Sequence, residues 1–182
     1  MSFKKLTWKT DVSNQSLVKS SVQRAIRAKV LEAYPALTEH IESILPKKSQ
    51  IVLVKCVEHR NLVTVNNEIL FFQVFDGPWV PVLRILHKYP DMMTKVQVDK
   101  GAIKFILSGA NIMCPGLTSK GARLDMSAPE NTPVAVYAEG KEYAVGVGIT
   151  KMSTDDIKKI NKGIGVDNLH SVGDGLWLAK ME

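Results

Sequence analysis

Cysteine and histidine are scarce in this sequence, which has two cysteines and four histidines among 182 residues. Cys56 and Cys114 lie far apart without a CxxC spacing, so we expect neither a zinc site nor a disulfide framework. Two free thiols fit a reducing compartment. The histidines fall in four different segments, and none has a companion at metal-ligand spacing. Each histidine is therefore interpreted as a surface or hydrogen-bonded core residue, and no metal centre is predicted.

Long apolar runs and catalytic motifs are also missing. No run approaches the roughly 18 apolar residues of a membrane span, and residues 1–16 lack the apolar region of a signal peptide. We therefore expect a cytoplasmic protein without membrane contact. Neither G-x-S-x-G, nor H-E-x-x-H, nor G-x-x-x-x-G-K-S/T occurs as a usable motif. These absences favour a binding protein without a cofactor over an enzyme.

Charge and glycine are distributed unevenly along the chain. The formal net charge is +6, and residues 1–30 contain seven Lys and Arg residues against a single acidic residue. Residues 96–182 are balanced, with ten basic and ten acidic side chains. Only one of the 12 glycines, Gly77, precedes residue 96. This change of composition predicts two domains, residues 1–93 and residues 94–182.

The first domain is expected to be α+β and to begin with a helix. Ser13 is a suitable N-cap for a helix that runs to about Tyr34. Apolar residues recur along this segment at helical spacing and predict one buried face: Val18, Val22, Ala25, Ile26, Val30 and Ala33.

A β-hairpin is expected to follow, formed by residues 61–65 and 68–75. Asn66 and Asn67 lie between the two strands, and asparagine tolerates the positive φ of a tight turn. The aromatic residues in and after the second strand are interpreted as core: Phe71, Phe72, Phe75 and Trp79.

The second domain is expected to be a small, closed or nearly closed β-barrel with short helices, because short strands alternate with glycine turns. Strands are predicted at 133–138, 143–150, 169–172 and 176–178. Ser153 is expected to cap a helix with acidic residues in its first turn and lysines in its last. The predicted fold class of the whole chain is therefore α+β.

Residues 98–117 carry the most informative local pattern. Two Gly-Ala pairs, Gly101-Ala102 and Gly109-Ala110, bracket a short apolar helix. Glycine lets backbone N–H groups approach a ligand, and a helix start offers unpaired N–H groups to an anion. Lys100 and Lys104 lie one turn apart on one helix face. We interpret this stretch as a cradle for a phosphate backbone.

The excess positive charge lies in the N-terminal segment and in the loop of residues 46–49. Neighbouring cations can contact nucleic-acid phosphates and give salt-sensitive binding. A solvated helix face shows the same pattern, and the residues alone leave both interpretations open. The candidate basic patch comprises Lys4, Lys5, Lys9, Lys19, Arg24, Arg27, Lys47 and Lys48.

Residues 98–117 resemble the signature of the PUA domain, an RNA-binding fold named after pseudouridine synthases and archaeosine transglycosylases. The matching elements are Asp99-x-Gly101-Ala102, Ser108-Gly109-Ala110, Ile112 and Pro115-Gly116-Leu117, with the later glycine strand of Gly146 and Gly148. Essentially the whole chain resembles the malignant-T-cell-amplified-sequence family of translation proteins. The segments that carry this second resemblance are residues 46–48, 70–72, 86–90, 98–105, 107–119 and 161–163.

The resemblance implies a non-enzymatic, RNA-binding translation factor that acts on the small ribosomal subunit in reinitiation and in recycling after termination. It implies that the PUA domain contacts the acceptor end of a tRNA, and that the N-terminal domain contacts rRNA and a density-regulated-type partner with an SUI-type domain. The RNA-binding cleft is expected to comprise Lys100, Gly101, Ala102, Lys104, Ser108, Gly109, Ala110 and Asn111.

Two other functions remain open from the sequence. PUA domains often accompany RNA-modification enzymes, so the chain could be the RNA-targeting subunit of such an enzyme. Alternatively, the N-terminal domain could be a protein-binding scaffold without RNA contact. Binding to ribosomal subunits, and an assay for modified nucleosides, would separate the three.

Overall fold

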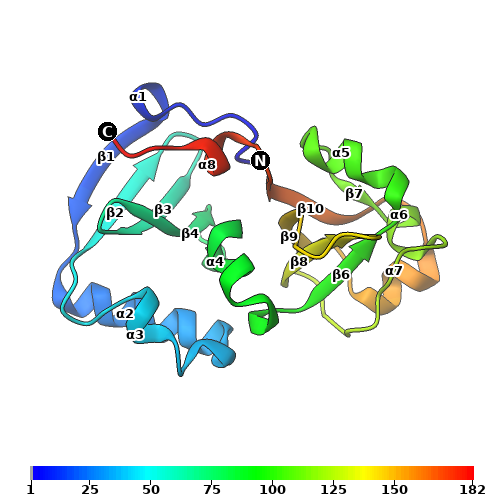
Figure 1. The fold of residues 1–182 in the computed structure, drawn as a ribbon, viewed down its shortest axis with the longest axis horizontal. Helices are drawn as coiled ribbons and strands as arrows, with labels where there is room; N and C mark the ends of the chain where they lie inside the picture. Colours follow the sequence, from blue (N-terminus) through cyan, green and yellow to red (C-terminus); the bar gives the residue numbers. More distant parts are fainter. Residues whose placement is uncertain (1) are drawn as a thin grey trace.

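The computed structural model describes residues 2–182, which form two five-stranded sheets side by side (Figure 1). The first sheet is antiparallel throughout and has the order β1-β2-β3-β4-β5. Its strands are β1 Val12–Leu17, β2 Ile51–Cys56, β3 Arg60–Val65, β4 Glu68–Val74 and β5 Val80–Pro81. The accompanying helices are α1 Trp8–Asp11, α2 Ser20–Ala33, η1 Pro35–Leu37, α3 Ile41–Ile44, α4 Leu83–Lys88 and η2 Pro90–Met92.

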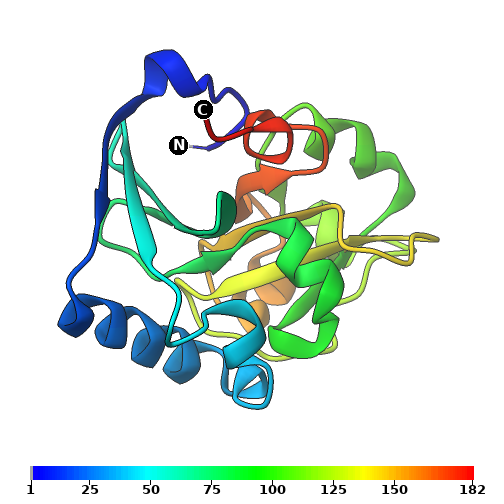
Figure 2. The same ribbon diagram turned by 60° about the vertical axis from the view of Figure 1, so that its left-hand side comes forward.

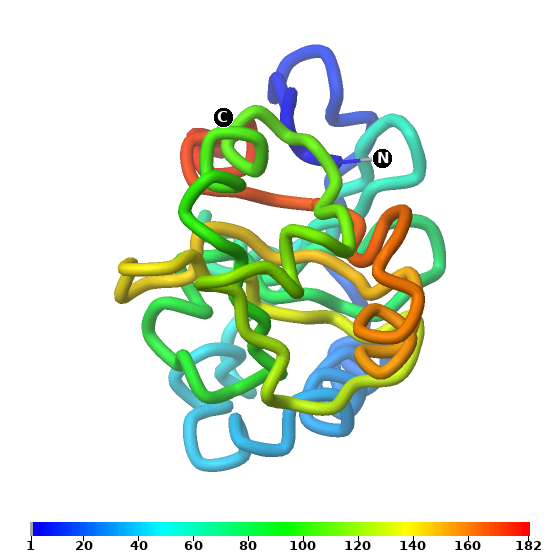
Figure 3. Tube along the Cα trace, turned by 90° about the vertical axis from the view of Figure 1, so that its right-hand side faces the viewer, coloured from blue at the N-terminus to red at the C-terminus, as the bar shows by residue number. Residues whose placement is uncertain are grey.

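The second sheet has the order β6-β8-β9-β10-β7, and only the β6–β8 pair is parallel. Its strands are β6 Lys95–Val98, β7 Ile112–Met113, β8 Pro133–Ala138, β9 Gly146–Thr150 and β10 Ile164–Ser171. Its helices are η3 Lys100–Ala102, α5 Ile103–Leu107, α6 Pro115–Thr118, α7 Thr154–Ile160 and α8 Gly175–Leu178. The sheet is curled, with the β8–β9 connection projecting on one side and α7 on the other (Figure 3).

Local sequence signals explain several of these elements. Asn66 and Asn67 adopt φ values of 51° and 62° between β3 and β4, so the predicted hairpin is confirmed. The Ser153 side chain accepts a hydrogen bond from the N–H of Asp156, which confirms the predicted cap of α7.

The helix predicted from residue 13 is wrong in its first turn and a half. Residues 12–17 form β1, whose backbone pairs with β2 and whose polar side chains lie in solvent. Instead of capping a helix, Ser13 donates its hydroxyl to the Lys55 carbonyl at 3.0 Å. The helix begins at Ser20, after an extended Lys19.

The buried face of α2 is also narrower than the sequence predicts. Val22 is 42% exposed, and Ala25 and Ala33 are exposed as well. The helix instead buries Ile26 and Val30 against the first sheet. Only a narrow stripe of α2 therefore contacts the core, and the other predicted apolar positions of the helix face solvent.

Two further predictions are corrected. Phe75 is 50% exposed, because it adopts a φ of +54° after β4 and stacks on His59 instead of entering the core. Residues 176–178 are helical, because the Asp174 carboxylate accepts a hydrogen bond from the N–H of Trp177 and so starts α8. The other three aromatic residues of the predicted core cluster are buried.

The chain ends cross between the two sheets (Figures 1 and 2). Near the N-terminus, Phe3 is fully buried and donates its N–H to the Leu169 carbonyl of β10 at 2.8 Å. Near the C-terminus, Leu176 joins a core cluster that contains residues of both sheets, and the N–H of Gly175 bonds the Lys4 carbonyl. The Phe3 ring packs on Phe72 of the first sheet while its backbone bonds to β10, so the N-terminal segment contacts both sheets.

A buried histidine links the same elements. His170 on β10 accepts a hydrogen bond at Nε2 from the N–H of Leu83, the first residue of α4. Its Nδ1 therefore carries the proton and donates to the Asp174 carboxylate at 2.9 Å. His170 is thus a hydrogen-bonded core residue that joins the second sheet to α4 and to the cap of α8.

Candidate nucleic-acid interface

A cleft of about 550 Å³ opens on the second sheet, where η3, α5 and β7 meet. Its lining is mostly apolar and includes exposed large side chains. Phe105 is 56% exposed and Met113 is 49% exposed. Ile164 pairs with Met113 across β10 and β7, which places both side chains at the same edge of the sheet.

The start of η3 is closed by carboxylates. The Asp99 Oδ1 accepts from the N–H of Ala102 at 3.0 Å, and its Oδ2 accepts from the Ser119 hydroxyl at 2.6 Å. The N–H of Lys100 is bonded to Glu139 at 3.0 Å. Two of the N–H groups that the sequence offers to a phosphate are therefore already paired. The cleft is suited to a flat apolar group, such as a nucleobase, more than to a bare anion.

The structure brings together half of the predicted cleft residues. Gly101, Ala102, Ala110 and Asn111 line the cleft. The loop that carries Ala110 and Asn111 is held in place by the Asn168 side chain, which donates hydrogen bonds to the carbonyls of Ile106 and Ala110.

The other four predicted residues lie beside the cleft. Lys104 places its ammonium 5.1 Å from the centroid of the Phe105 ring, so a cation adjoins the cleft rim. Lys100, at the start of η3, is exposed. Ser108 donates its hydroxyl to the Phe105 carbonyl. Gly109 has a φ of +91°, and a Cβ there would lie 2.8 Å from Cδ of Lys4. Gly109 thus allows the N-terminal segment to cross, which is a packing role.

Sequence reasoning missed Phe105, Met113, Ile164 and Asp99. One signal was available: four of the five residues of α5 are apolar, although a helix this short buries only Ile106. An excess of apolar residues on a surface helix indicates an exposed binding face.

The predicted basic patch divides into two separate groups. Lys19, Arg24, Arg27, Lys47 and Lys48 line a hollow of about 580 Å³ between α2 and the loop before β2. The N-terminal segment, which carries Lys4, Lys5 and Lys9, lies at the opposite end of the first sheet (Figures 1 and 2). These three lysines therefore cannot contribute to one surface with α2.

Arg27 is a structural member of the α2 hollow. It is only 8% exposed, and its guanidinium donates to the Leu45 carbonyl and to Glu42. The hydrogen bond from Arg27, and then that from the Lys47 backbone N–H, lower the pKa of Glu42. Within residues 2–182, no carboxylate lies within 4.0 Å of the charged groups of the remaining four cations: Lys19, Arg24, Lys47 and Lys48.

Residues 2–182 contain no cluster of three or more His, Cys, Asp or Glu side chains that could hold a metal ion. No helix among them has the length and apolar character needed to cross a bilayer.

Comparison with known proteins finds a family match for each half of the chain. Residues 6–90 match the family described as Pre-PUA-like domain, and residues 94–172 match the PUA domain. The chain is 52% identical to Malignant T-cell-amplified sequence 1-A of Xenopus laevis over 178 residues, covering 98% of each chain. It is 49% identical to Translation machinery-associated protein 20 of Schizosaccharomyces pombe over 180 residues, covering 99% of each.

A solved structure gives the same fold. A hypothetical protein from Pyrococcus horikoshii OT3 superposes with a TM-score of 0.71, covering 90% of this chain and 98% of that chain. The identity of 24% limits this likeness to the fold. The predicted fold class, an α+β domain followed by a PUA-type domain with short helices, is confirmed. The small barrel predicted for the second domain is a curled sheet, whose end strands β6 and β7, within residues 2–182, do not pair with each other.

Proposed function

The chain belongs to the malignant-T-cell-amplified-sequence family, and from this premise we propose that it is an RNA-binding, translation-associated protein that acts without catalysis. Its proposed place of action is the small ribosomal subunit in the cytoplasm, in reinitiation and in recycling after termination. The observation that carries the proposal is the open apolar cleft of the second sheet. Exposed aromatic and apolar side chains beside a cation form a surface on which unpaired bases stack.

The proposed guest of the cleft is the acceptor end of a tRNA. A single-stranded end offers free base faces, and Phe105 offers an exposed ring at the cleft wall. Lys104, whose ammonium lies near that ring, can neutralise an adjoining phosphate. The closed start of η3 fits this arrangement, because the bases rather than a phosphate would occupy the centre of the cleft.

The proposed rRNA contact is the α2 hollow. Four of its cations lack a carboxylate partner in residues 2–182, and they come from a helix and an adjacent loop that Gln23 holds together. Clustered unpaired cations supply salt-sensitive phosphate binding. A density-regulated-type protein with an SUI-type domain completes the proposal as heterodimer partner.

Substitution of the cleft aromatic residue tests this function. Phe105→Ala should weaken binding of a CCA-ended tRNA to the complex of the protein with small ribosomal subunits by roughly tenfold, because one base stack contributes about 1–3 kcal/mol. Leu178→Ala is the control, since Leu178 is also a largely exposed apolar side chain but lies on α8, outside the cleft. Filter binding and a reinitiation reporter measure the effect. Equal behaviour of the two variants would remove the cleft from the proposal.

A further inference from the structure

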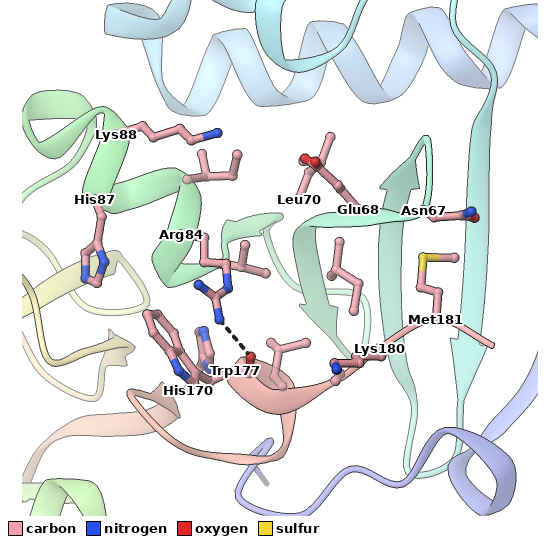
Figure 4. A pocket seen from close by; sticks show the side chains of 15 residues that line it. Asn67, Glu68, Leu70, Arg84, His87, Lys88, His170, Trp177, Lys180 and Met181 are labelled. Atoms are coloured by element: carbon pink, nitrogen blue, oxygen red, sulfur yellow. Dashed lines mark hydrogen bonds between the residues drawn. The ribbon is translucent and has the colours of Figure 1, made fainter.

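A second hollow lies on the first sheet, between β4, α4 and the C-terminal segment (Figure 4). Its volume is about 600 Å³, and Trp177 and Lys180 lie at one end. A smaller hollow of about 140 Å³ begins where it ends, and both are lined by Glu68, Leu70, Ile85 and Lys88. The two hollows therefore form one elongated groove, here called the β4 groove, that runs on toward the α3 end of the sheet.

The wall of the β4 groove includes an open strand edge. On the side away from β3, β4 pairs with β5 only at Phe71 and Phe72. The Leu70 carbonyl accepts the N–H of Val82, and in residues 2–182 no strand pairs with Glu68 or Ile69 on that side. An open edge of this kind can accept the backbone of an extended chain as an additional strand.

The charge of the groove is positive. Arg84, Lys88 and Lys180 line its larger part, where Glu68 is the single acidic side chain. None of the three cations has a carboxylate within 4.0 Å among residues 2–182. Lys88 extends from α4 across the groove toward the β4 side, and Lys180 approaches from the C-terminal segment (Figure 4). Ile69 and Met181, which also line this part of the groove and are partly exposed, supply apolar surface.

The groove is better suited to a peptide than to RNA. Its large aromatic side chain, Trp177, is covered by the Arg84 guanidinium, whose Cζ lies 4.0 Å from the ring centroid, and the His87 ring meets it edge-on at a centroid distance of 5.8 Å. A nucleobase would have to displace these groups before it could stack. An extended peptide needs no aromatic platform, because backbone hydrogen bonds and alternate side chains hold it on a sheet edge.

We propose that the β4 groove binds an extended acidic segment of a protein partner, which adds to the open edge of β4. Acidic side chains of this segment meet Arg84, Lys88 and Lys180, and the alternate side chains are apolar and face the partly exposed Ile69 and Met181. The site is separate from the RNA contacts proposed above and does not depend on them.

Selection from a displayed library of random short peptides against the full chain provides the probe. The recovered peptides should alternate acidic with apolar residues, and their affinity is measured by fluorescence anisotropy. Lys88→Glu with Lys180→Glu should weaken binding at least about tenfold, since reversing a charge opposite an acid costs several kcal/mol. This pair leaves the Arg84–Trp177 contact intact, so the fold is retained. N-methylation of alternate peptide amides should weaken binding similarly.

The matched control is Lys120→Glu with Lys141→Glu, which makes the same charge change on exposed lysines of the second half of the chain. Peptides without acidic enrichment, or an equal loss in the control pair, would overturn the proposal. Displacement of the bound peptide by oligouridylate would instead identify an RNA groove. Displacement by adenosine monophosphate would identify a small-molecule site, and either result also overturns it.

Discussion

Arg24 and Arg27 lie on the same helix, yet the structure gives them different roles. Arg27 is buried and supplies hydrogen bonds to Leu45 and Glu42, whereas Arg24 is exposed in the α2 hollow. Arg27→Ala should lower the free energy of unfolding by about 1–3 kcal/mol, because the Leu45 carbonyl loses its donor. Arg24→Ala should change it by less than about 0.5 kcal/mol. Urea unfolding measures both.

Binding to the small ribosomal subunit should depend on Arg24, although the stability of the fold does not. Arg24→Glu should weaken small-subunit binding and flatten its dependence on salt, because each lost phosphate contact reduces the counterions released. Co-sedimentation at several salt concentrations measures this. Equal stability losses for the two alanine variants, or an unchanged salt slope for Arg24→Glu, would contradict the assignment of roles.

The pH dependence of Arg27→Ala follows from the Glu42 carboxyl. Because the pKa of Glu42 is lowered in the folded state from 4.5, the unfolded chain binds more protons as the pH falls below that value. The Arg27–Glu42 contribution to stability is therefore present above about pH 4.5 and is lost as the pH falls through the folded pKa. The stability gap between wild type and Arg27→Ala should accordingly narrow in acid.

At the scale of elements, those with local signals were predictable. The Asn66-Asn67 turn and the Ser153 cap depend on residues within a few positions, so the sequence is sufficient for both. The strand β1 could not be predicted, because its polar residues are held by pairing with β2, far along the chain. A side chain that looks like a helix cap is then used across a strand pair.

The residues of the cleft also separate into those with a local sequence signal and those without one. Gly101 and Ala110 lie within the pattern that predicted them, and both line the cleft. Ile164 joins them only because β10 pairs with β7, which aligns it with Met113. A side chain brought in by long-range strand pairing leaves no local signal. The division of the basic patch was hidden for the same reason, since the path of β1 separates the N-terminal lysines from α2.

The short helix α8 depends on a single side chain. The Asp174 carboxylate accepts hydrogen bonds from the N–H groups of Ser171 and Trp177 and from Nδ1 of His170. Asp174→Ala should lower the free energy of unfolding by about 2–4 kcal/mol, because a cap and a buried charge-assisted hydrogen bond are lost together. Thermal unfolding measures it. Asp155→Ala, which changes an exposed acid on α7, is the control, and a similar loss there would contradict the special role of Asp174.

For the whole molecule, the terminal segments and a shared core make the two sheets depend on each other. The backbone of Phe3 and Lys4 bonds to β10 and to the start of α8, while Leu176 packs in a core cluster formed by residues of both sheets. His170 adds a buried hydrogen bond from β10 to α4. The predicted boundary near residue 93 is therefore a boundary of sheets, and we expect the two halves to unfold together.

Calorimetry tests this expectation. The full chain should unfold in one transition whose calorimetric and van't Hoff enthalpies agree. Deletion of residues 174–182 should lower the midpoint of that single transition, because the core shared by the two sheets loses buried Leu176, worth about 2–5 kcal/mol, and His170 loses its carboxylate partner. Deletion of Glu182 alone, whose ion pair with Lys9 is exposed and long at 3.9 Å, should leave the midpoint unchanged. If the deletion of residues 174–182 shifted only one of two separate transitions, residues 1–93 and 94–182 would be independent domains and the crossing segments mere surface contacts.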